Sequence, residues 1–307
     1  MTKISIIGAG QVGGTTALYI AEKGLGDIIL LDVVEGLPQG KALDLKQAAP
    51  LQSYDIDIIG TNDYKEIKDS DLVVVTAGIA RKPGMSREDL VNTNYKIIKE
   101  VSLQIKKYSS ESKVIVVTNP LDVMTYAVWK VTNFASNSVF GMSGVLDGCR
   151  FATFIAHKLK VSAQEVNAMV LGGHGDAMVP LPQYTTVTGI PITKLLDKDT
   201  INKLIDRTIH GGAEIVSYLK TGSAFYAPAA SIAKMVESII EDKKRIMPVS
   251  AYVTGEYGIS GIYLGVPVIL GKNGVEHIIE LDLTEEENKK LLNSAEVVKN
   301  TIAILDL

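Results

Sequence analysis

The strongest constraint on the fold is a regular alternation of short apolar runs and helical segments up to about residue 142. The apolar runs are rich in β-branched residues and lack a polar–apolar alternation, which is typical of strands covered on both faces. Strands that alternate with helices favour a parallel, doubly wound sheet. We expect strands at 3–8, 27–32, 55–60, 71–78 and 112–120, and helices at 11–24, 38–49 and about 86–108.

The alternation stops after residue 142, where the chain contains the helical segment 197–219 and later apolar runs that indicate an antiparallel sheet. A chain of 307 residues is long enough for two domains. We therefore predict an α/β protein with a doubly wound parallel sheet in residues 1–142 and an α+β domain in residues 143–307. No proline- or serine-rich linker separates these parts, so we expect them to pack tightly.

A glycine motif follows the first expected strand. Its three glycines have the spacing G-x-G-x-x-G and lie between a strand and a helix, the context of a Rossmann dinucleotide-binding turn. The first glycine permits a tight turn, the second lets the backbone approach a pyrophosphate, and the third lets the helix pack on the strand. The expected cofactor-binding residues of this turn are Gly8, Gly10, Gln11, Val12 and Gly13.

An acidic residue indicates which dinucleotide binds. Asp32 closes the second expected strand, at the distance from the glycines at which a carboxylate binds ribose hydroxyls. A carboxylate there repels a 2′-phosphate, and the following segment 33–40 contains no Arg or Lys. The sequence therefore favours NAD over NADP.

Composition excludes several classes of partner. The net charge is −4, which gives no reason to expect nucleic acid or an anionic membrane. Cys149 is the only cysteine, so an intrachain disulfide and a multi-cysteine metal site are excluded. No segment is apolar enough to span a membrane, and because the chain enters a strand at once, we expect no signal peptide. We expect a cytoplasmic protein that uses no metal.

A histidine between two glycines is the candidate acid–base group. His174 has glycine flanks that let a substrate come close, and it needs a partner that orients its ring. Asp147 and Arg150 are spaced to share one helix face, where the carboxylate could orient the imidazole and the guanidinium could clamp a substrate carboxylate. The same spacing also fits a simple surface ion pair. Asn119 ends another parallel strand, where such sheets bind ligands.

Taken together, the motifs resemble the L-malate dehydrogenases of the lactate-dehydrogenase-like group, in the lactate/malate dehydrogenase family. The resemblance runs along essentially the whole chain and keeps the order of the family's motifs. Gly148 and Cys149 depart from the serine or threonine expected beside Arg150. The motifs are "GAGQVGG", "TAGIARKPGMSREDL", "VTNPLD", "LDGCR", "GGHGD" and "TGSAFYAPA".

The resemblance implies an NAD-dependent oxidoreductase that interconverts L-malate and oxaloacetate, with a homodimeric or homotetrameric assembly and a small dicarboxylate substrate. It implies that His174 is the catalytic acid–base and Asp147 its partner, and that Arg150 binds the carboxylate next to the reacting carbon. The remaining implied positions are Arg87 on the carbonyl oxygen, Asn119 on both substrate and cofactor, and Asn94, Val117, Thr118 and Asn119 along NAD.

The cationic residues of the loop 78–87 indicate which substrate the protein uses. By the resemblance, Arg81 is the side chain that discriminates between substrates, because oxaloacetate has a second carboxylate that pyruvate lacks. We expect this loop to close over an anionic substrate and exclude water. Two alternatives stay open: an L-lactate or broad 2-hydroxyacid dehydrogenase, and a non-catalytic NAD-binding sensor. A sensor needs no proton donor, and Arg81 argues against a lactate enzyme.

Overall fold

The computed structural model describes residues 2–80 and 86–306, with no description of the Arg87 side chain. Its main sheet has the strand order β3-β2-β1-β4-β5-β6-β12-β13-β8-β9, with β14 paired to β13. A separate small sheet has the order β11-β10-β7. The fold is therefore mixed α/β, as the sequence predicted.

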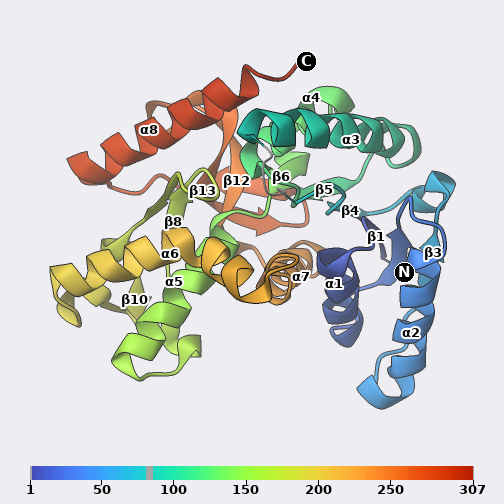
Figure 1. Ribbon diagram of the computed structural model, residues 1–307, viewed down its shortest axis with the longest axis horizontal. Coiled ribbons are helices and arrows are strands. Elements are labelled where there is room, and N and C mark those ends of the chain that lie inside the picture. Colours follow the sequence, from blue (N-terminus) through green and yellow to red (C-terminus); the bar gives the residue numbers. More distant parts are fainter. Residues whose placement is uncertain (1, 81–85, 307) are drawn as a thin grey trace.

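The N-terminal part of the main sheet is parallel from β3 to β6. Figure 1 shows α3 and α4 on one side of these strands and α1 and α2 on the other. The elements are β1 (Lys3–Ile7), α1 (Gln11–Glu22), β2 (Asp27–Leu31), α2 (Leu37–Gln52), β3 (Ile58–Thr61), β4 (Leu72–Val75), α3 (Arg87–Tyr108), β5 (Lys113–Val116), α4 (Leu121–Thr132) and β6 (Val139–Gly141).

Two apolar clusters cover the two faces of the parallel strands. Ile4 and Ile6 of β1 belong to the cluster that contains Ala17 and Ile20 of α1. Ile7, the neighbour of Ile6, belongs to the cluster formed with α3 and α4. Because successive side chains of a strand point to opposite faces, each strand needs apolar residues at nearly every position. This explains the unbroken apolar runs in the sequence.

The C-terminal part continues the same sheet. Ser250 of β12 pairs antiparallel with Gly141 of β6, so the antiparallel strands extend the parallel ones edge to edge. The elements are α5 (Gly144–Leu159), β7 (Val166–Asn167), β8 (Val170–Gly172), β9 (Met178–Pro180), β10 (Thr186–Val187), β11 (Ile190–Pro191), α6 (Lys198–Leu219), α7 (Tyr226–Ile240), β12 (Arg245–Thr254), β13 (Ser260–Gly271), β14 (Gly274–Ile278) and α8 (Glu285–Ile302).

The expected antiparallel sheet is therefore present, but it is joined to the parallel sheet by hydrogen bonds. The long pair of β12 and β13 is antiparallel, and β14 pairs with β13 in the same way. The proposed division at residues 142 and 143 falls in the short segment between β6 and α5, and it stays a prediction.

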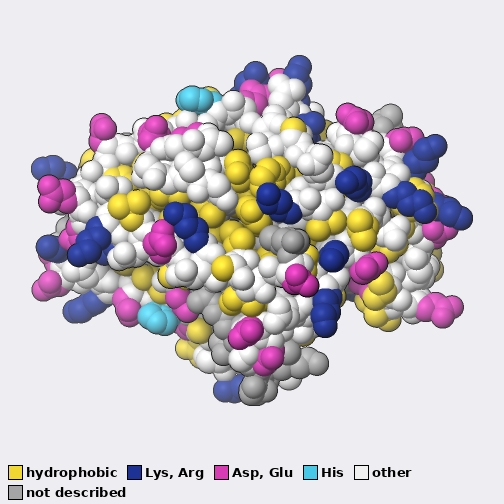
Figure 2. Space-filling model, turned by 90° about the horizontal axis from the view of Figure 1, so that it is seen from above, with side chains coloured by type: hydrophobic (Ala, Val, Ile, Leu, Met, Phe, Trp, Pro, Cys, Tyr) yellow, Lys and Arg dark blue, Asp and Glu magenta, His cyan; other side chains and the backbone are white. Residues whose placement is uncertain are grey.

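The surface that Figure 2 shows has Lys and Arg side chains interspersed with Asp and Glu, and apolar side chains spread across its middle. This view looks down on α8. Leu292 and Val297 are exposed apolar residues of that helix, and the exposed Ile304 follows its last residue. In the described residues, no helix is both long and apolar enough to cross a membrane.

Candidate active site

The glycine turn between β1 and α1 has the geometry that a dinucleotide requires. Gly8 adopts a φ of +110°, a conformation that glycine enters without strain. A Cβ atom on Gly13 would lie 1.8 Å from the carbonyl oxygen of Gly8, so only glycine lets α1 pack this close. A Cβ atom on Gly10 would meet no protein atom within 4 Å. The turn thus leaves open space where the helix begins.

The first turn of α1 has the properties of an anion site. Gly10 is the residue before the helix, and no side chain caps the helix there. Gln11 and Val12 form the first helical positions. The free N–H groups of a helix start, together with the helix dipole, favour a phosphate group. These residues therefore fit the pyrophosphate of NAD.

Asp32 follows β2 and lies against the glycine turn. Its carboxylate accepts hydrogen bonds from the backbone N–H of Ala9 at 2.6 Å and of Val34 at 3.0 Å. These two bonds orient the carboxylate beside the turn. Its oxygens have further lone pairs that can accept hydrogen bonds from ribose hydroxyls.

Lys41 is a residue of this site that the sequence reading missed. Its ammonium group, carried by α2, donates a hydrogen bond to the carbonyl oxygen of Gly10 at 2.9 Å. Burial lowers the pKa of Lys41, although the nearby charge of Asp32 acts in the opposite direction. The segment 33–40 has no cation, but α2 brings the next residue back to the glycine turn. The feature of the sequence that could have indicated this contact is a lysine one turn after the start of the expected helix.

The ends of β4 and β5 are joined through Asn94. This fully buried side chain accepts a hydrogen bond from the Ile79 N–H at 2.8 Å and donates to the Asn119 carbonyl at 2.6 Å. The Thr118 hydroxyl donates to the Ala77 carbonyl at 2.6 Å, and the backbone N–H of Val117 donates to Val75 at 2.9 Å. The predicted residues 94 and 117–119 therefore line one edge of the parallel sheet.

His174, Asp147 and Arg150 come together although 27 residues separate the histidine from the aspartate. The Nδ1 atom of His174 lies 2.8 Å from Oδ2 of Asp147, and Arg150 lies 3.3 Å from Oδ1 of the same carboxylate. Asp147 is 1% exposed, so the alternative that Asp147 and Arg150 form a simple ion pair at the surface is wrong. The carboxylate shares its two oxygens between the imidazole and the guanidinium.

Burial and the charges of neighbouring side chains determine the proton affinity of His174. Burial by itself lowers the pKa of His174, but the charge and hydrogen bond of Asp147 outweigh burial, and the pKa lies above its ordinary value. Arg150 opposes this rise and Asp122 supports it. Because Asp147 occupies Nδ1, Nε2 is the ring nitrogen without a hydrogen-bond partner among residues 2–80 and 86–306.

Two glycines of α6 lie beside the partly buried side chain of Arg150. A Cβ atom on Gly211 would lie 3.4 Å from Cδ of Arg150, and one on Gly212 would lie 3.6 Å from its terminal nitrogen. The "GG" pair in α6 therefore lets that helix pack beside the guanidinium. In the part of the chain that is described, the buried Nε of Arg150 has no hydrogen-bond partner.

Arg81 lies outside the described residues, and so does the side chain of Arg87. The backbone of Arg87 begins α3. Ser86 caps this helix: its hydroxyl accepts from the Asp89 N–H at 3.0 Å, and the Asp89 carboxylate accepts from the Ser86 N–H at 3.1 Å. This capping box determines where the helix starts next to the cationic loop.

Asp122 and Ser250 are the other residues that the sequence reading missed. Asp122 is 4% exposed, and it accepts a hydrogen bond from the backbone N–H of His174 at 2.9 Å. Its other oxygen accepts from the Ser250 hydroxyl at 2.6 Å. Asp122 was visible in the "VTNPLD" motif, but no local signal connects it to residues 174 or 250.

The other histidines lie within regular elements: His157 in α5, His210 in α6 and His277 in β14. His210 lies in the middle of its helix, far from both ends at Lys198 and Leu219. No group of three or more potential metal-ligating side chains occurs in the residues that the structure describes.

Comparisons with known proteins agree along the whole chain. Residues 2–141 match the lactate/malate dehydrogenase NAD binding domain, and residues 144–305 match the alpha/beta C-terminal domain of the same family. A malate dehydrogenase of Methanosarcina barkeri is 61% identical over 307 residues, covering all of both chains.

Two solved structures share the fold. The apo malate dehydrogenase of Picrophilus torridus has a TM-score of 0.96 and 51% identity, covering 99% of this chain and 97% of its own. The lactate dehydrogenase of Cryptosporidium parvum, complexed with lactic acid and nicotinamide adenine dinucleotide, has a TM-score of 0.96 and 44% identity, covering 99% and 98%. The chain belongs to the lactate/malate dehydrogenase family.

Proposed function

We propose that this protein is an NAD-dependent malate dehydrogenase, which interconverts L-malate and oxaloacetate. The observation that carries the proposal is the contact of 2.8 Å between Nδ1 of His174 and Asp147, with Arg150 on the same carboxylate. A sensor that only bound NAD would need no such proton donor. The name of the M. barkeri relative, at 61% identity over the full length, supports the choice of substrate.

The cofactor site consists of the glycine turn, Asp32 and the edge formed by residues 94 and 117–119. The turn offers α1 N–H groups to the pyrophosphate, and Asp32 offers its carboxylate to the ribose hydroxyls. When bound there, the nicotinamide supplies or accepts the hydride. Lys41 holds the Gly10 carbonyl and adds a positive charge near the phosphates.

His174 moves the proton in this proposal. In reduction, the imidazolium donates its Nε2 proton to the carbonyl oxygen of oxaloacetate as the hydride reaches the carbonyl carbon. Asp147 stabilises the imidazolium through Nδ1 and keeps the ring oriented. In malate oxidation the neutral imidazole accepts the hydroxyl proton. The raised pKa of His174 keeps a larger fraction protonated near neutral pH.

Three arginines recognise the substrate in this proposal. Arg150 binds the carboxylate next to the reacting carbon, and its partnerless Nε supports a role as an anion ligand. Arg87 polarises the carbonyl, where a fixed cation acts on the developing negative charge. Arg81 pairs with the distal carboxylate. The roles of Arg81 and Arg87 depend on the sequence motif alone.

The second candidate is an L-lactate or broad 2-hydroxyacid dehydrogenase. The C. parvum lactate dehydrogenase has the same TM-score as the malate dehydrogenase of P. torridus, so the fold does not separate the two activities. Arg81 separates them on chemical grounds, because pyruvate has a methyl group where oxaloacetate has a carboxylate.

The test is a set of initial rates for oxaloacetate and pyruvate, each with NADH and NADPH. We expect rapid turnover of oxaloacetate with NADH. Arg81→Gln should lower kcat/KM for oxaloacetate by about a hundredfold or more, as expected for a lost buried Arg–carboxylate pair. Pyruvate reduction should stay unchanged or improve. The matched variant Arg87→Gln should impair both substrates, because it acts on the shared carbonyl.

Two outcomes would contradict this assignment. Equal losses for both substrates in Arg81→Gln would make Arg81 a general loop residue. Equal use of NADPH and NADH by the unmodified protein would show that Asp32 does not select NAD.

The homodimeric or homotetrameric state and the cytoplasmic location remain proposals. Leu292 and Val297 of α8, and Ile304 directly after it, are exposed apolar side chains of the kind that another chain covers in an oligomer. Light scattering after size-exclusion chromatography would measure the number of chains. The lone cysteine agrees with a reducing compartment.

A further inference from the structure

A second buried carboxylate lies behind the candidate proton donor. Asp122 occupies the first turn of α4 and is 4% exposed. One of its oxygens accepts a hydrogen bond from the backbone N–H of His174 at 2.9 Å, and the other accepts one from the Ser250 hydroxyl at 2.6 Å. His174 is therefore held by two carboxylates, its ring by Asp147 and its backbone by Asp122.

The loop around His174 needs such an anchor. Gly172 and Gly175 have φ angles of +82° and +96°, in the left-handed region, and glycines on both sides of the histidine leave no neighbouring side chain to fix the backbone. A second side chain that anchors this stretch is Ser294, whose hydroxyl accepts a hydrogen bond from the Gly173 N–H at 2.8 Å. The first anchor carries a carboxylate and the second is neutral.

Asp122 also connects the two halves of the site. Its helix begins directly after Asn119 and Pro120, at the sheet edge that the proposed cofactor residues form. Ser250 lies on β12, at its pairing with Gly141 of β6, the strand where the parallel sheet meets the antiparallel one. A single side chain thus joins the cofactor edge, the His174 loop and the junction of the sheet.

The charge of Asp122 acts on the same imidazole. Among the groups that the structure describes, three charged side chains act on His174: Asp147 and Arg150 from α5, and Asp122 from α4. Asp122 and Asp147 raise the pKa of His174, and Arg150 lowers it. Burial raises the pKa of Asp122 itself, while the bonds from Ser250 and His174 act in the opposite direction. A carboxylate in the first turn of a helix also gains from the helix dipole.

We propose that Asp122 is a positioning residue for His174, which fixes the backbone of the catalytic loop and favours the protonated imidazole by its charge. The proposal rests on the proposed role of His174 as the acid–base group. Asp122 touches neither substrate nor cofactor in this scheme, and it acts only through His174.

The informative variant is Asp122→Asn. An asparagine has nearly the same shape, its amide oxygen can accept the His174 N–H, and the Ser250 hydroxyl can turn to accept from its amide group. The variant therefore keeps both contacts and removes only the charge. The matched control is Ser294→Ala, which removes the neutral anchor of the same loop without changing any charge.

The measurement is an NMR titration of His174 in the protein without substrate, with His174→Asn used to identify its resonance among the four histidines. Asp122→Asn should lower the pKa of His174 by about half a unit or more, since it removes a nearby opposite charge. Ser294→Ala should leave this pKa in place. In the rate assay, Asp122→Asn should move the pH profile of oxaloacetate reduction to lower pH and leave the Kd for NADH within about threefold of its normal value.

An unchanged pKa of His174 in a folded Asp122→Asn protein overturns the proposal, whatever happens to the rate. If that variant does not fold, Ser250→Ala serves instead, because loss of the hydroxyl makes Asp122 harder to ionise and should shift the same pKa downward by less. No shift in that variant also overturns the proposal. The titration needs no turnover, so it tests Asp122 even if the protein reduces neither oxaloacetate nor pyruvate.

Discussion

At the scale of single residues, the chemistry of the site depends on how one carboxylate is shared. Asp147 is almost fully buried, and it contacts both the His174 ring and Arg150. A buried carboxylate is stable only when paired, and here both its oxygens have partners. The pairing leaves His174 with a raised pKa and with Nε2 for the substrate. Arg150 keeps donors for a substrate anion because one oxygen of Asp147 engages only part of its guanidinium.

The first prediction concerns the pH dependence. Reduction needs the imidazolium, so its rate should fall as the pH rises through the pKa of His174. Malate oxidation needs the neutral ring and should rise over the same range. Since Asp147 raises this pKa, Asp147→Asn should move both profiles to lower pH and slow reduction most.

Initial rates in both directions between about pH 5 and 9 would measure these profiles, since that range spans the ordinary pKa of histidine. His174→Asn is the control, and it should lower turnover by about 10²–10⁴ while NADH still binds. Profiles that keep their position in Asp147→Asn would show that another group sets the proton affinity of His174.

At the scale of elements, the contact of α1 with β1 explains the glycine spacing. Gly13 is buried and faces the Gly8 carbonyl, whereas Gly10 borders open space at the helix start. The two glycines therefore serve different purposes in one motif: Gly13 serves the packing of the protein, and Gly10 serves the approach of a ligand.

The second prediction separates these two purposes. Gly13→Ala should destabilise the protein by several kcal/mol, as expected for overpacking against rigid backbone, because a Cβ atom would lie 1.8 Å from an oxygen. Gly10→Ala should leave stability within about 1 kcal/mol, since the site is open and its φ of −63° suits alanine. It should nevertheless weaken NADH binding strongly, because the methyl group occupies the space for the pyrophosphate.

Thermal unfolding and NADH fluorescence titrations would measure the two effects. If Gly10→Ala bound NADH with its normal Kd, the pyrophosphate would not lie over Gly10. If Gly13→Ala were as stable as the unmodified protein, α1 would have shifted away from β1.

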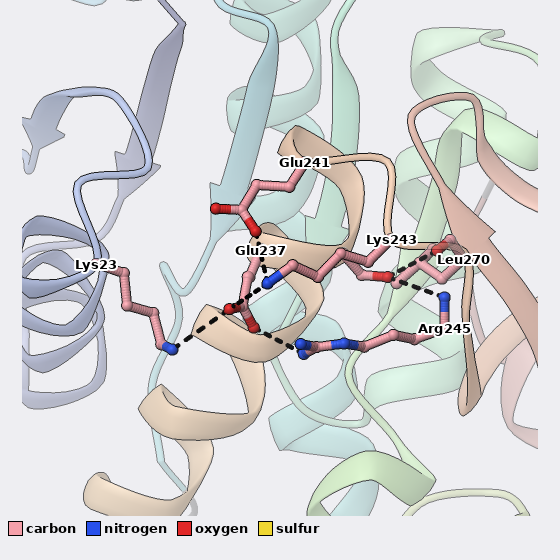
Figure 3. Close-up of polar contacts among 7 residues, drawn as sticks. Lys23, Glu237, Glu241, Lys243, Arg245 and Leu270 are labelled. Carbon is pink, nitrogen blue, oxygen red and sulfur yellow. Dashed lines mark hydrogen bonds and ion pairs between the residues drawn. The ribbon is translucent and has the colours of Figure 1, made fainter.

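At the scale of the whole molecule, the continuous sheet joins the N-terminal and C-terminal parts of the chain. A cluster of ion pairs adds a second connection between them. Glu237 of α7 lies 2.8 Å from Lys243, 2.7 Å from Arg245 and 3.6 Å from Lys23, which follows α1 (Figure 3). The hydrogen bonds from Lys243 and Arg245, together with the charges of Arg245 and Lys23, outweigh burial and lower the pKa of Glu237 to about 2. The cluster thus links the end of α1 to α7 and to the start of β12.

The third prediction concerns acid stability. The pKa of Glu237 is depressed in the folded state, so its carboxylate stabilises the fold above its ordinary pKa of 4.5, and this contribution disappears as the pH falls toward 2. Glu237→Gln should lower the free energy of unfolding by about 1–3 kcal/mol at pH 7, after allowance for the partly exposed lysines. The difference should vanish near the lowered pKa.

Urea unfolding of both proteins at several pH values would measure this difference. Glu241→Gln is the matched control, because Glu241 pairs with the same Lys243 and is more exposed, so its loss should change little. A destabilisation of Glu237→Gln that stayed constant down to acid pH would show that packing, and not charge, accounts for the effect.

Local signals in the sequence were enough for the parallel sheet and its first helices. The apolar runs, the glycine spacing and the position of Asp32 each depend on a few neighbouring residues, so they predicted the parallel sheet and the NAD site directly. The residues of that site stay a prediction. The glycine flanks of His174 also marked it locally, and the spacing of Asp147 and Arg150 offered a partner for its ring but left a surface ion pair open. Arg81 stays a prediction from the sequence.

Only the tertiary structure decided which distant residues meet. Asp122 and Ser250 are 128 positions apart in the sequence, and Lys41 contacts Gly10, which is 31 positions away. Strand β12 pairs with β6 in one sheet. No periodicity encodes these contacts, because they arise when helices and strands bury their apolar faces together. Asp147 and Asp122 become buried only when the chain packs. The same packing brings one carboxylate to the ring of His174 and the other to its backbone N–H.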